Sequence, residues 1–288
     1  MNQYVSVQDR AVVGFPRRPF KLTHGLRGHP LFELGRLEEL VSSLPAESIE
    51  YNAGDVAISQ DPDTAPQTGL TPAETIRRIE DCESWMLMHD VESDPEYAQL
   101  LDAVLDEVAE LTEPIEPGMH ERRAFIIVSS AASVTPYHFD PEQNFLLQVR
   151  GSKQVHVFDP FDDRLVSETD RERVFAGKGK PNLDLDDALS DSGEEFRLDA
   201  GEGLCIPFQA PHWVRVGNGV SISFSMTWQT HRTEHFFDIH RVNMALRRAG
   251  LTPVPPGRSP WRDAVKQTGV DVVRGVARGT KRLARRLR

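Results

Sequence analysis

Two histidines and an aspartate have the types and spacing that a redox-active metal ion requires. His138 and Asp140 are separated by one residue in a strand-like stretch, and His212 follows 72 residues after Asp140 in a second such stretch. Side chains on a strand alternate between two faces, so His138 and Asp140 are expected to point the same way. Two imidazoles and one carboxylate on one face of a metal are the ligand set of non-haem Fe(II) oxygenases. The spacing predicts a metal site at these three residues.

Two other interpretations of histidine spacing have to be weighed. A His-x-Asp pair on its own also fits two hydrogen-bonded surface residues at a strand edge. A rival cluster, His231 and His235 with Asp238 and His240, would share one face of a helix. It lacks the His-Glu-x-x-His order of zinc proteases, so we interpret it as the solvated start of a helix.

The residues from Thr135 to Lys153 follow the pattern Thr-Pro-x-His-x-Asp-x-x-x-Asn-Phe-x-x-Gln-Val-Arg-Gly-x-Lys without a break. Together with the stretch from Asp199 to Trp228, they resemble the JmjC-type, cupin-like family of Fe(II)/2-oxoglutarate oxygenases. The pattern is similar to that of the branch containing the asparaginyl hydroxylase of hypoxia-inducible factors. The resemblance covers about residues 118–230.

This resemblance implies roles for the matching side chains. His138, Asp140 and His212 match the iron ligands. Lys153 matches the lysine that holds the distal carboxylate of 2-oxoglutarate, and Thr135 matches its hydroxyl partner. A buried carboxylate needs a charged donor with further hydrogen bonds, which an ammonium group supplies. The implied cofactor is Fe(II), with 2-oxoglutarate and dioxygen as cosubstrates.

Two further positions complete the comparison with the family. Asn144 matches the asparagine near the metal-bound end of the cosubstrate. Ser225 stands where the hydroxylase has asparagine, so its contact with 2-oxoglutarate is left open.

The resemblance implies an Fe(II)/2-oxoglutarate-dependent oxygenase that hydroxylates a protein side chain or a small molecule. One alternative is a cupin-like binding or regulatory module without catalysis, which retention of the complete ligand set disfavours. Another is a metal-dependent cupin enzyme that does not use 2-oxoglutarate, but Lys153 and Thr135 would then be unexplained. The substrate is not readable, because fold and cofactor do not determine it.

Charge is unevenly distributed along the 288 residues. The net charge is −11, yet residues 258–288 carry ten Lys or Arg against two Asp, a local balance of +8 that leaves −19 for the rest. An acidic body does not suit nucleic-acid binding. For the basic tail we favour docking on the acidic body or homodimer formation through C-terminal helices. Contact with nucleic acid or an anionic membrane is less supported, because the tail has no strong aromatic or leucine face.

Cysteine content and the first residues bear on the compartment. Two cysteines, Cys82 and Cys205, make neither a disulfide framework nor a cysteine-built zinc site. Residues 1–10 lack the basic-then-apolar order of a signal peptide, and no apolar run approaches the ~20 residues that span a bilayer. We expect a cytoplasmic protein.

The expected secondary structure changes from helix to strand near Pro117. Helical spacing is expected over 31–44, from Thr71 to about His89, and after Asp94. Thr71-Pro-Ala-Glu74 predicts a capping box at a helix start.

After Pro117, short β-rich runs separated by Gly turns predict an antiparallel barrel. The alternation in Ser221-Ile-Ser-Phe-Ser-Met is the clearest strand signal. The fold class expected is mainly β with flanking helices around a double-stranded β-helix (jelly-roll, cupin/JmjC-like) core. A helical or looping region over 1–117 would support a barrel over 118–230, with a long polar insertion over 162–195 and a C-terminal helical region over 231–288.

Overall fold

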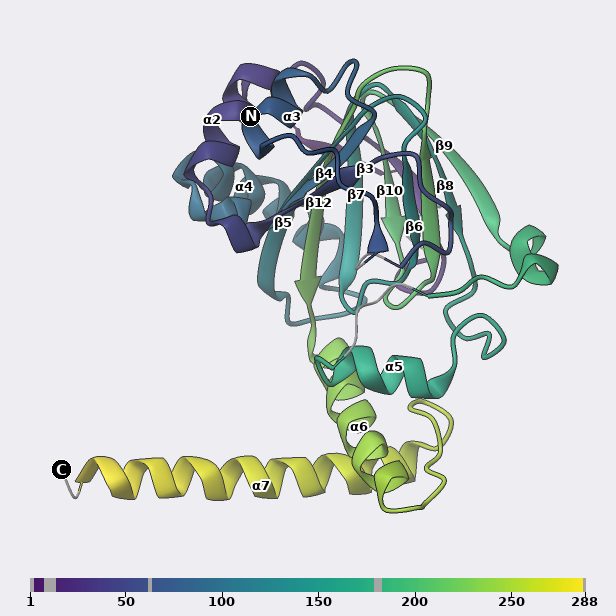
Figure 1. Cartoon of the computed structure of the whole chain (residues 1–288). Helices are drawn as coiled ribbons and strands as arrows, with labels where there is room; N and C mark the ends of the chain where they lie inside the picture. The colour runs from purple at the N-terminus through teal and green to yellow at the C-terminus, as the bar shows by residue number, and fades with distance from the viewer. Residues whose placement is uncertain (1–2, 8–13, 62–63, 179–182, 287–288) are drawn as a thin grey trace. The chain divides into compact units, whose positions relative to one another are not determined.

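The protein, seen in a computed structural model, contains two antiparallel sheets with flanking helices (Figure 1). The structure describes residues 3–7, 14–61, 64–178 and 183–286. The extreme ends of the predicted N-terminal region and basic tail, and residues 179–182 of the predicted insertion, lie outside the described residues. The mainly β fold class is confirmed.

The larger sheet has the strand order β1-β2-β10-β7-β12-β5-β4-β3. Its strands, in chain order, are β1 Val5–Ser6, β2 Phe20–His24, β3 Ile49–Ala53, β4 Ser84–Met88, β5 His120–Ser129, β7 Gln143–Arg150, β10 Glu202–Ile206 and β12 Ser221–Gln229. Every neighbouring pair is antiparallel.

The smaller sheet has the order β6-β11-β8-β9, again antiparallel throughout. Its strands are β6 Val134–His138, β8 Ser152–Val157, β9 Glu194–Asp199 and β11 His212–Val216. Strands β5 to β12 therefore distribute between the two sheets, four in each. An apolar cluster that includes Leu146 and Leu204 of the larger sheet and Val155 and Val214 of the smaller one joins the two. This is the predicted jelly-roll core.

Short helices accompany the sheets in the same unit, which comprises residues 1–165 and 181–230. They are η1 Pro30–Phe32, α2 Leu34–Ser43, η2 Ala46–Ser48, α3 Pro72–Arg77, η4 Val91–Ser93, α4 Pro95–Thr112 and η5 Asp187–Ser192. Helices α2 and α4 lie on the same side of the larger sheet, with α4 beside β5 (Figure 1). Their apolar stripes, such as Leu37 and Leu40 of α2 and Val104 of α4, join one large core with the sheet.

The start of the helix predicted from Thr71 is confirmed, but its predicted end near His89 is wrong. Thr71 Oγ1 accepts a hydrogen bond from the Glu74 amide while the Glu74 carboxylate accepts one from the Thr71 amide, so the capping box is confirmed. The helix ends at Arg77, and Ser84–Met88 forms strand β4 between β3 and β5. Met86 and Met88 are fully buried there, so tertiary packing overrides the local helical preference.

A second compact unit comprises residues 166–180 and 231–288. It contains α5 Glu168–Phe175, α6 His231–Arg248 and α7 Pro260–Arg286. Arg247 of α6 forms two hydrogen bonds of 2.9 Å with the buried Glu172 of α5. No helix in the described ranges is long and apolar enough to cross a membrane. The division of the chain at residues 117 and 230 stays a prediction.

Candidate active site

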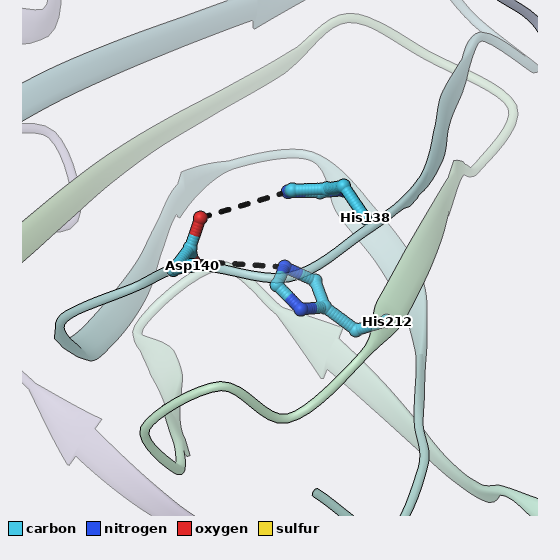
Figure 2. A group of neighbouring side chains, drawn as sticks. All are labelled: His138, Asp140 and His212. Carbon is cyan, nitrogen blue, oxygen red and sulfur yellow. Dashed lines mark ion pairs between the residues drawn. The ribbon is translucent and has the colours of Figure 1, made fainter. Parts of the chain in front are cut away.

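His138, Asp140 and His212 converge although 72 residues separate the last two (Figure 2). His138 ends β6 and His212 begins β11, and the two residues are directly paired across these antiparallel strands. The register shifts immediately after His212, a bulge of the kind that re-aims side chains at functional sites. The Gln209 amide also donates to the Asp140 carbonyl at 3.0 Å, which ties the two ligand-bearing segments together. One ligand atom from each of the three side chains lies within 4.8 Å of the others.

The hydrogen bonds of both imidazoles leave the same nitrogen available. His138 Nδ1 lies 2.7 Å from the Pro136 carbonyl oxygen, and His212 Nδ1 lies 3.0 Å from that of Ala210. A carbonyl oxygen only accepts, so in each ring Nδ1 carries the proton and donates it. Each Nε2 then has a free lone pair directed toward the site, the tautomer that a metal-binding histidine needs.

The spacing between the three groups fits an ion better than direct hydrogen bonds. Each Nε2 is 3.8 Å from an oxygen of the Asp140 carboxylate, along the dashed lines of Figure 2. That separation is too long for a hydrogen bond. Burial, with a smaller contribution from His138, lowers the pKa of His212 to about 4, so its imidazole is neutral near pH 7. The donor set therefore fits Fe(II).

A hydrogen-bond chain from β7 and β12 holds the Asp140 carboxylate. Asn144 Nδ2 donates to Asp140 Oδ2 at 2.6 Å. The Ser225 hydroxyl, on β12, donates to Asn144 Oδ1 at 2.9 Å. This second bond determines which end of the Asn144 amide faces Asp140. Ser225 thus acts through Asn144, a contact that the sequence comparison left open.

Lys153 lies on β8 with its side chain on the inner face of the smaller sheet, and it is only 3% exposed. No hydrogen bond or carboxylate partner satisfies its ammonium group among the described residues, and burial lowers its pKa to about 7. An unpaired ammonium in such a place is unfavourable unless an anion binds to it. The residue is therefore suited to hold a ligand carboxylate.

Thr135 shares the inner face of the same sheet. Thr135 is opposite Val214, and Lys153 is opposite Val216, two residues further along β11. Trp85 of β4 donates its indole N–H to the Thr135 hydroxyl at 3.0 Å. Because that oxygen accepts from Trp85, its own proton is available for a second acceptor.

Two residues at the site were not predicted from the sequence. Trp85 lies in a stretch that the sequence analysis assigned to a helix, so no local signal connects it with Thr135. Glu142 follows Asp140 by two residues, and burial, together with the Asp140 charge, raises its pKa to about 7. Acidic residues are common after a turn, so its type alone carried no signal.

The rival histidine cluster does not form a metal site. Within the described ranges, one group of His, Cys, Asp and Glu side chains is close enough to share an ion, and it is His138, Asp140 and His212. On α6, the carboxylate of Asp238 instead accepts hydrogen bonds from Arg274, while the His240 ring stacks on Phe175.

The family model described as cupin-like domain matches residues 15–234. Lysine-specific demethylase 8 of Xenopus tropicalis is 30% identical over 107 residues, a match that spans 34% of this chain and 23% of the demethylase. The chain thus spans less than a quarter of the length of that relative.

A solved structure shows the same fold at low identity. An X-ray structure of E. coli YcfD is 14% identical, covers 94% of this chain and 68% of that protein, and has a TM-score of 0.52. A second structure, titled as YcfD, a ribosomal oxygenase from Escherichia coli, is 15% identical, covers 95% of this chain and 68% of that one, and has a TM-score of 0.45.

Proposed function

Because the chain belongs to the cupin-like (JmjC-type) domain family, we propose that it is an Fe(II)- and 2-oxoglutarate-dependent oxygenase. The substrate class proposed is a protein side chain or a small molecule, which the enzyme hydroxylates. The match to a relative named lysine-specific demethylase 8 favours a protein side chain of the two.

The buried, unpaired Lys153 is the observation that carries the proposal beyond metal binding. A cupin enzyme that used a metal without 2-oxoglutarate would have no need for an ammonium group in the barrel interior. 2-Oxoglutarate offers one end that chelates a metal and a carboxylate at the other end. Lys153 and the Thr135 hydroxyl supply the charge and the hydrogen bond that such a carboxylate requires.

The protein residues have separable tasks in this proposal. Fe(II) with 2-oxoglutarate and dioxygen supplies the oxidising chemistry when bound. His138, Asp140 and His212 hold the metal through two Nε2 atoms and a carboxylate. Asn144 keeps that carboxylate in place. The apolar residues between the sheets, such as Val155 and Val214, exclude water from the interior.

The proposal is tested by adding Fe(II) and 2-oxoglutarate to the purified full-length chain without oxygen. A metal-to-ligand charge-transfer absorption is expected only if the keto acid chelates iron in the site. With oxygen and ascorbate, slow formation of succinate is expected even without substrate. N-oxalylglycine with Fe(II) should raise the melting temperature. Absence of all three signals contradicts the proposal.

Two variants and one control separate the alternatives. His212→Gln should abolish iron binding, whereas His89→Gln, which changes a histidine outside the ligand group that is paired with Glu50, should not. Lys153→Met should retain iron but lose the 2-oxoglutarate signals. If Lys153→Met gives the wild-type absorption, the chain is not a 2-oxoglutarate enzyme of this design. If iron binds but 2-oxoglutarate never does, a cupin enzyme with another cosubstrate or a non-catalytic module is favoured.

A further inference from the structure

Helix α7 packs within its unit through its polar side. His235 Nδ1 of α6 lies 2.9 Å from Gln267 Oε1, within hydrogen-bond distance. Gln267 Nε2 donates to Asp238 Oδ2 at 3.2 Å. Arg274 donates two hydrogen bonds to the same carboxylate, at 2.6 and 2.8 Å. Asp263, which is buried, accepts from the amide of Gly257 at 2.8 Å. The hydrophilic face of this helix is thus the one that its neighbours cover.

Four apolar side chains of α7 face solvent instead. Trp261, Val265, Val272 and Val273 are 60–69% exposed, and they are four of the seven exposed large hydrophobic residues among those whose burial the structure describes. At about 100° per residue, Trp261, Val265 and Val272 fall within about 40° of one another around the helix. Asp263, Gln267 and Arg274 fall roughly on the opposite side. We call Trp261, Val265 and Val272 the apolar stripe; Val273 is also exposed but lies about 100° from Val272 around the helix.

Basic residues accompany the apolar stripe. Residues 258–288 carry a balance of +8. The Arg262 guanidinium lies over the Trp261 ring, 5.1 Å from its centroid, so a cation and an aromatic ring adjoin at the start of the stripe. In the sequence, Val276 and Leu283 continue the same helical spacing. An exposed apolar stripe with Trp at one end and a surplus of Lys and Arg is the composition of helices that lie in a membrane interface.

We propose that α7 binds an anionic lipid surface, lying parallel to it with the apolar stripe at the boundary between headgroups and acyl chains. Charge complementarity favours this occupant. Pairing with α7 of a second copy would bring two segments of +8 together. Nucleic acid would satisfy the charge but would leave the stripe exposed to water. With 27 residues the helix is about 40 Å long, which is long enough to lie along a surface.

Gly269 bears on how the helix acts. It lies in the interior of α7, and a Cβ placed on it would meet nothing within 4 Å, so packing does not require glycine there. Glycine weakens a helix relative to alanine. Gly269→Ala should therefore keep the helix and bind at least as tightly as the wild type.

The test uses the full chain and sedimentation with vesicles. Vesicles of equal parts phosphatidylglycerol and phosphatidylcholine are compared with pure phosphatidylcholine. The chain should sediment only with the anionic vesicles, and added salt should weaken binding. The double variant Val265→Asp, Val272→Asp should lower the affinity for the vesicles by about tenfold or more, because it removes apolar area and adds negative charge.

A matched control makes the same changes elsewhere. The double variant Ile115→Asp, Phe161→Asp also replaces two exposed apolar residues and adds two charges, but outside α7. It should bind as the wild type does. Equal binding by both double variants, or no sedimentation of the wild type, overturns the proposal. If the α7 double variant fails to fold, the single variant Val272→Asp decides, because unchanged binding by that variant overturns the proposal.

Two further outcomes would assign the stripe to another partner. Light scattering without lipid could show a dimer for the wild type and a monomer for the α7 double variant. The stripe would then be a contact with a second copy of the chain, and the proposal would be overturned. The wild type and the α7 double variant could both bind polyuridylate while neither binds vesicles. The tail would then be a nucleic-acid contact, and the proposal would be overturned as well.

Discussion

Strand β12, inside the larger sheet, is buried on both faces, yet its two faces have opposite chemistry. Its residues alternate between these faces. Those facing the helices are all fully buried and apolar: Ile222, Phe224, Met226 and Trp228. Those facing the smaller sheet are at most 6% exposed and carry hydroxyl groups: Ser221, Ser223, Ser225 and Thr227.

This contrast separates stability from function within one strand. Apolar burial on the outer face stabilises the fold in proportion to the area removed from water. On the inner face, two of these hydroxyl groups donate hydrogen bonds to β7: Ser223 to Gln148 at 2.6 Å and Ser225 to Asn144 at 2.9 Å. Satisfied polar groups in an interior contribute little net stability but specify geometry. The inner face is therefore where a bound ligand meets oriented donors and acceptors.

The largest effect is expected on the outer face. Phe224 contacts Phe32 with ring centroids 5.4 Å apart and is fully buried. Phe224→Ala should lower the free energy of unfolding by about 3–5 kcal/mol, because it leaves a cavity in the main core. Urea denaturation measures this loss. A loss below about 1 kcal/mol would show that the outer face is not the main source of stability.

On the inner face, Lys153→Met should change stability in the opposite direction. It removes a buried ammonium without a partner, so the free energy of unfolding near pH 7 should rise by about 1–4 kcal/mol. The same variant should bind 2-oxoglutarate about 100-fold more weakly or worse, because the charged donor is lost. A variant that is both destabilised and fully able to bind the keto acid would contradict this assignment.

Lys153 also predicts a dependence on pH. Its folded-state pKa of about 7 lies below its ordinary value of 10.5. The unfolded chain therefore binds more protons in this interval, so this residue makes stability rise with pH from about 7 to 10.5 and contributes no slope below it. Comparison of wild type with Lys153→Met isolates that slope. Binding of 2-oxoglutarate at pH 8 should take up protons, which calorimetry in buffers of different ionisation enthalpy detects.

Asn144→Ala should have a smaller effect, which is confined to the affinity for the metal ion. Without the 2.6 Å hydrogen bond, the Asp140 carboxylate loses its orientation. Removal of such an outer partner typically lowers metal affinity about 10–100-fold. Titration of Fe(II) under anaerobic conditions measures it. Unchanged affinity would mean that Asp140 is held by other contacts.

The smallest effect is expected from Ser225→Ala, which acts on Asp140 only through Asn144. We expect iron affinity to fall severalfold, less than for Asn144→Ala. Ser223→Ala is the matched control, since it removes a neighbouring inner-face hydroxyl that bonds to Gln148 instead. If both serine variants bind iron equally well, the chain from Ser225 to Asp140 has no positioning role.

Sequence reasoning was sufficient for the barrel, because period-two alternation and Gly turns are local signals. It was also sufficient to single out His138, Asp140 and His212 as a group. It was wrong from about residue 78 to 88, where the chain leaves the helix and then forms β4 over Ser84–Met88. The residues that support the site, such as Trp85 against Thr135, come from strands distant in the chain, so no window of sequence could pair them.

By itself, the amino-acid order determined which side chains share a face, because the geometry of a strand makes alternate residues point the same way. What each face of a strand packs against depends on the tertiary structure. The serines of β12 alternate with apolar residues as in any half-solvated strand, but a second sheet covers them and makes them an interior wall. For α7 the reverse holds: its polar face is covered and its apolar stripe exposed, because burial depends on neighbours that local sequence does not specify.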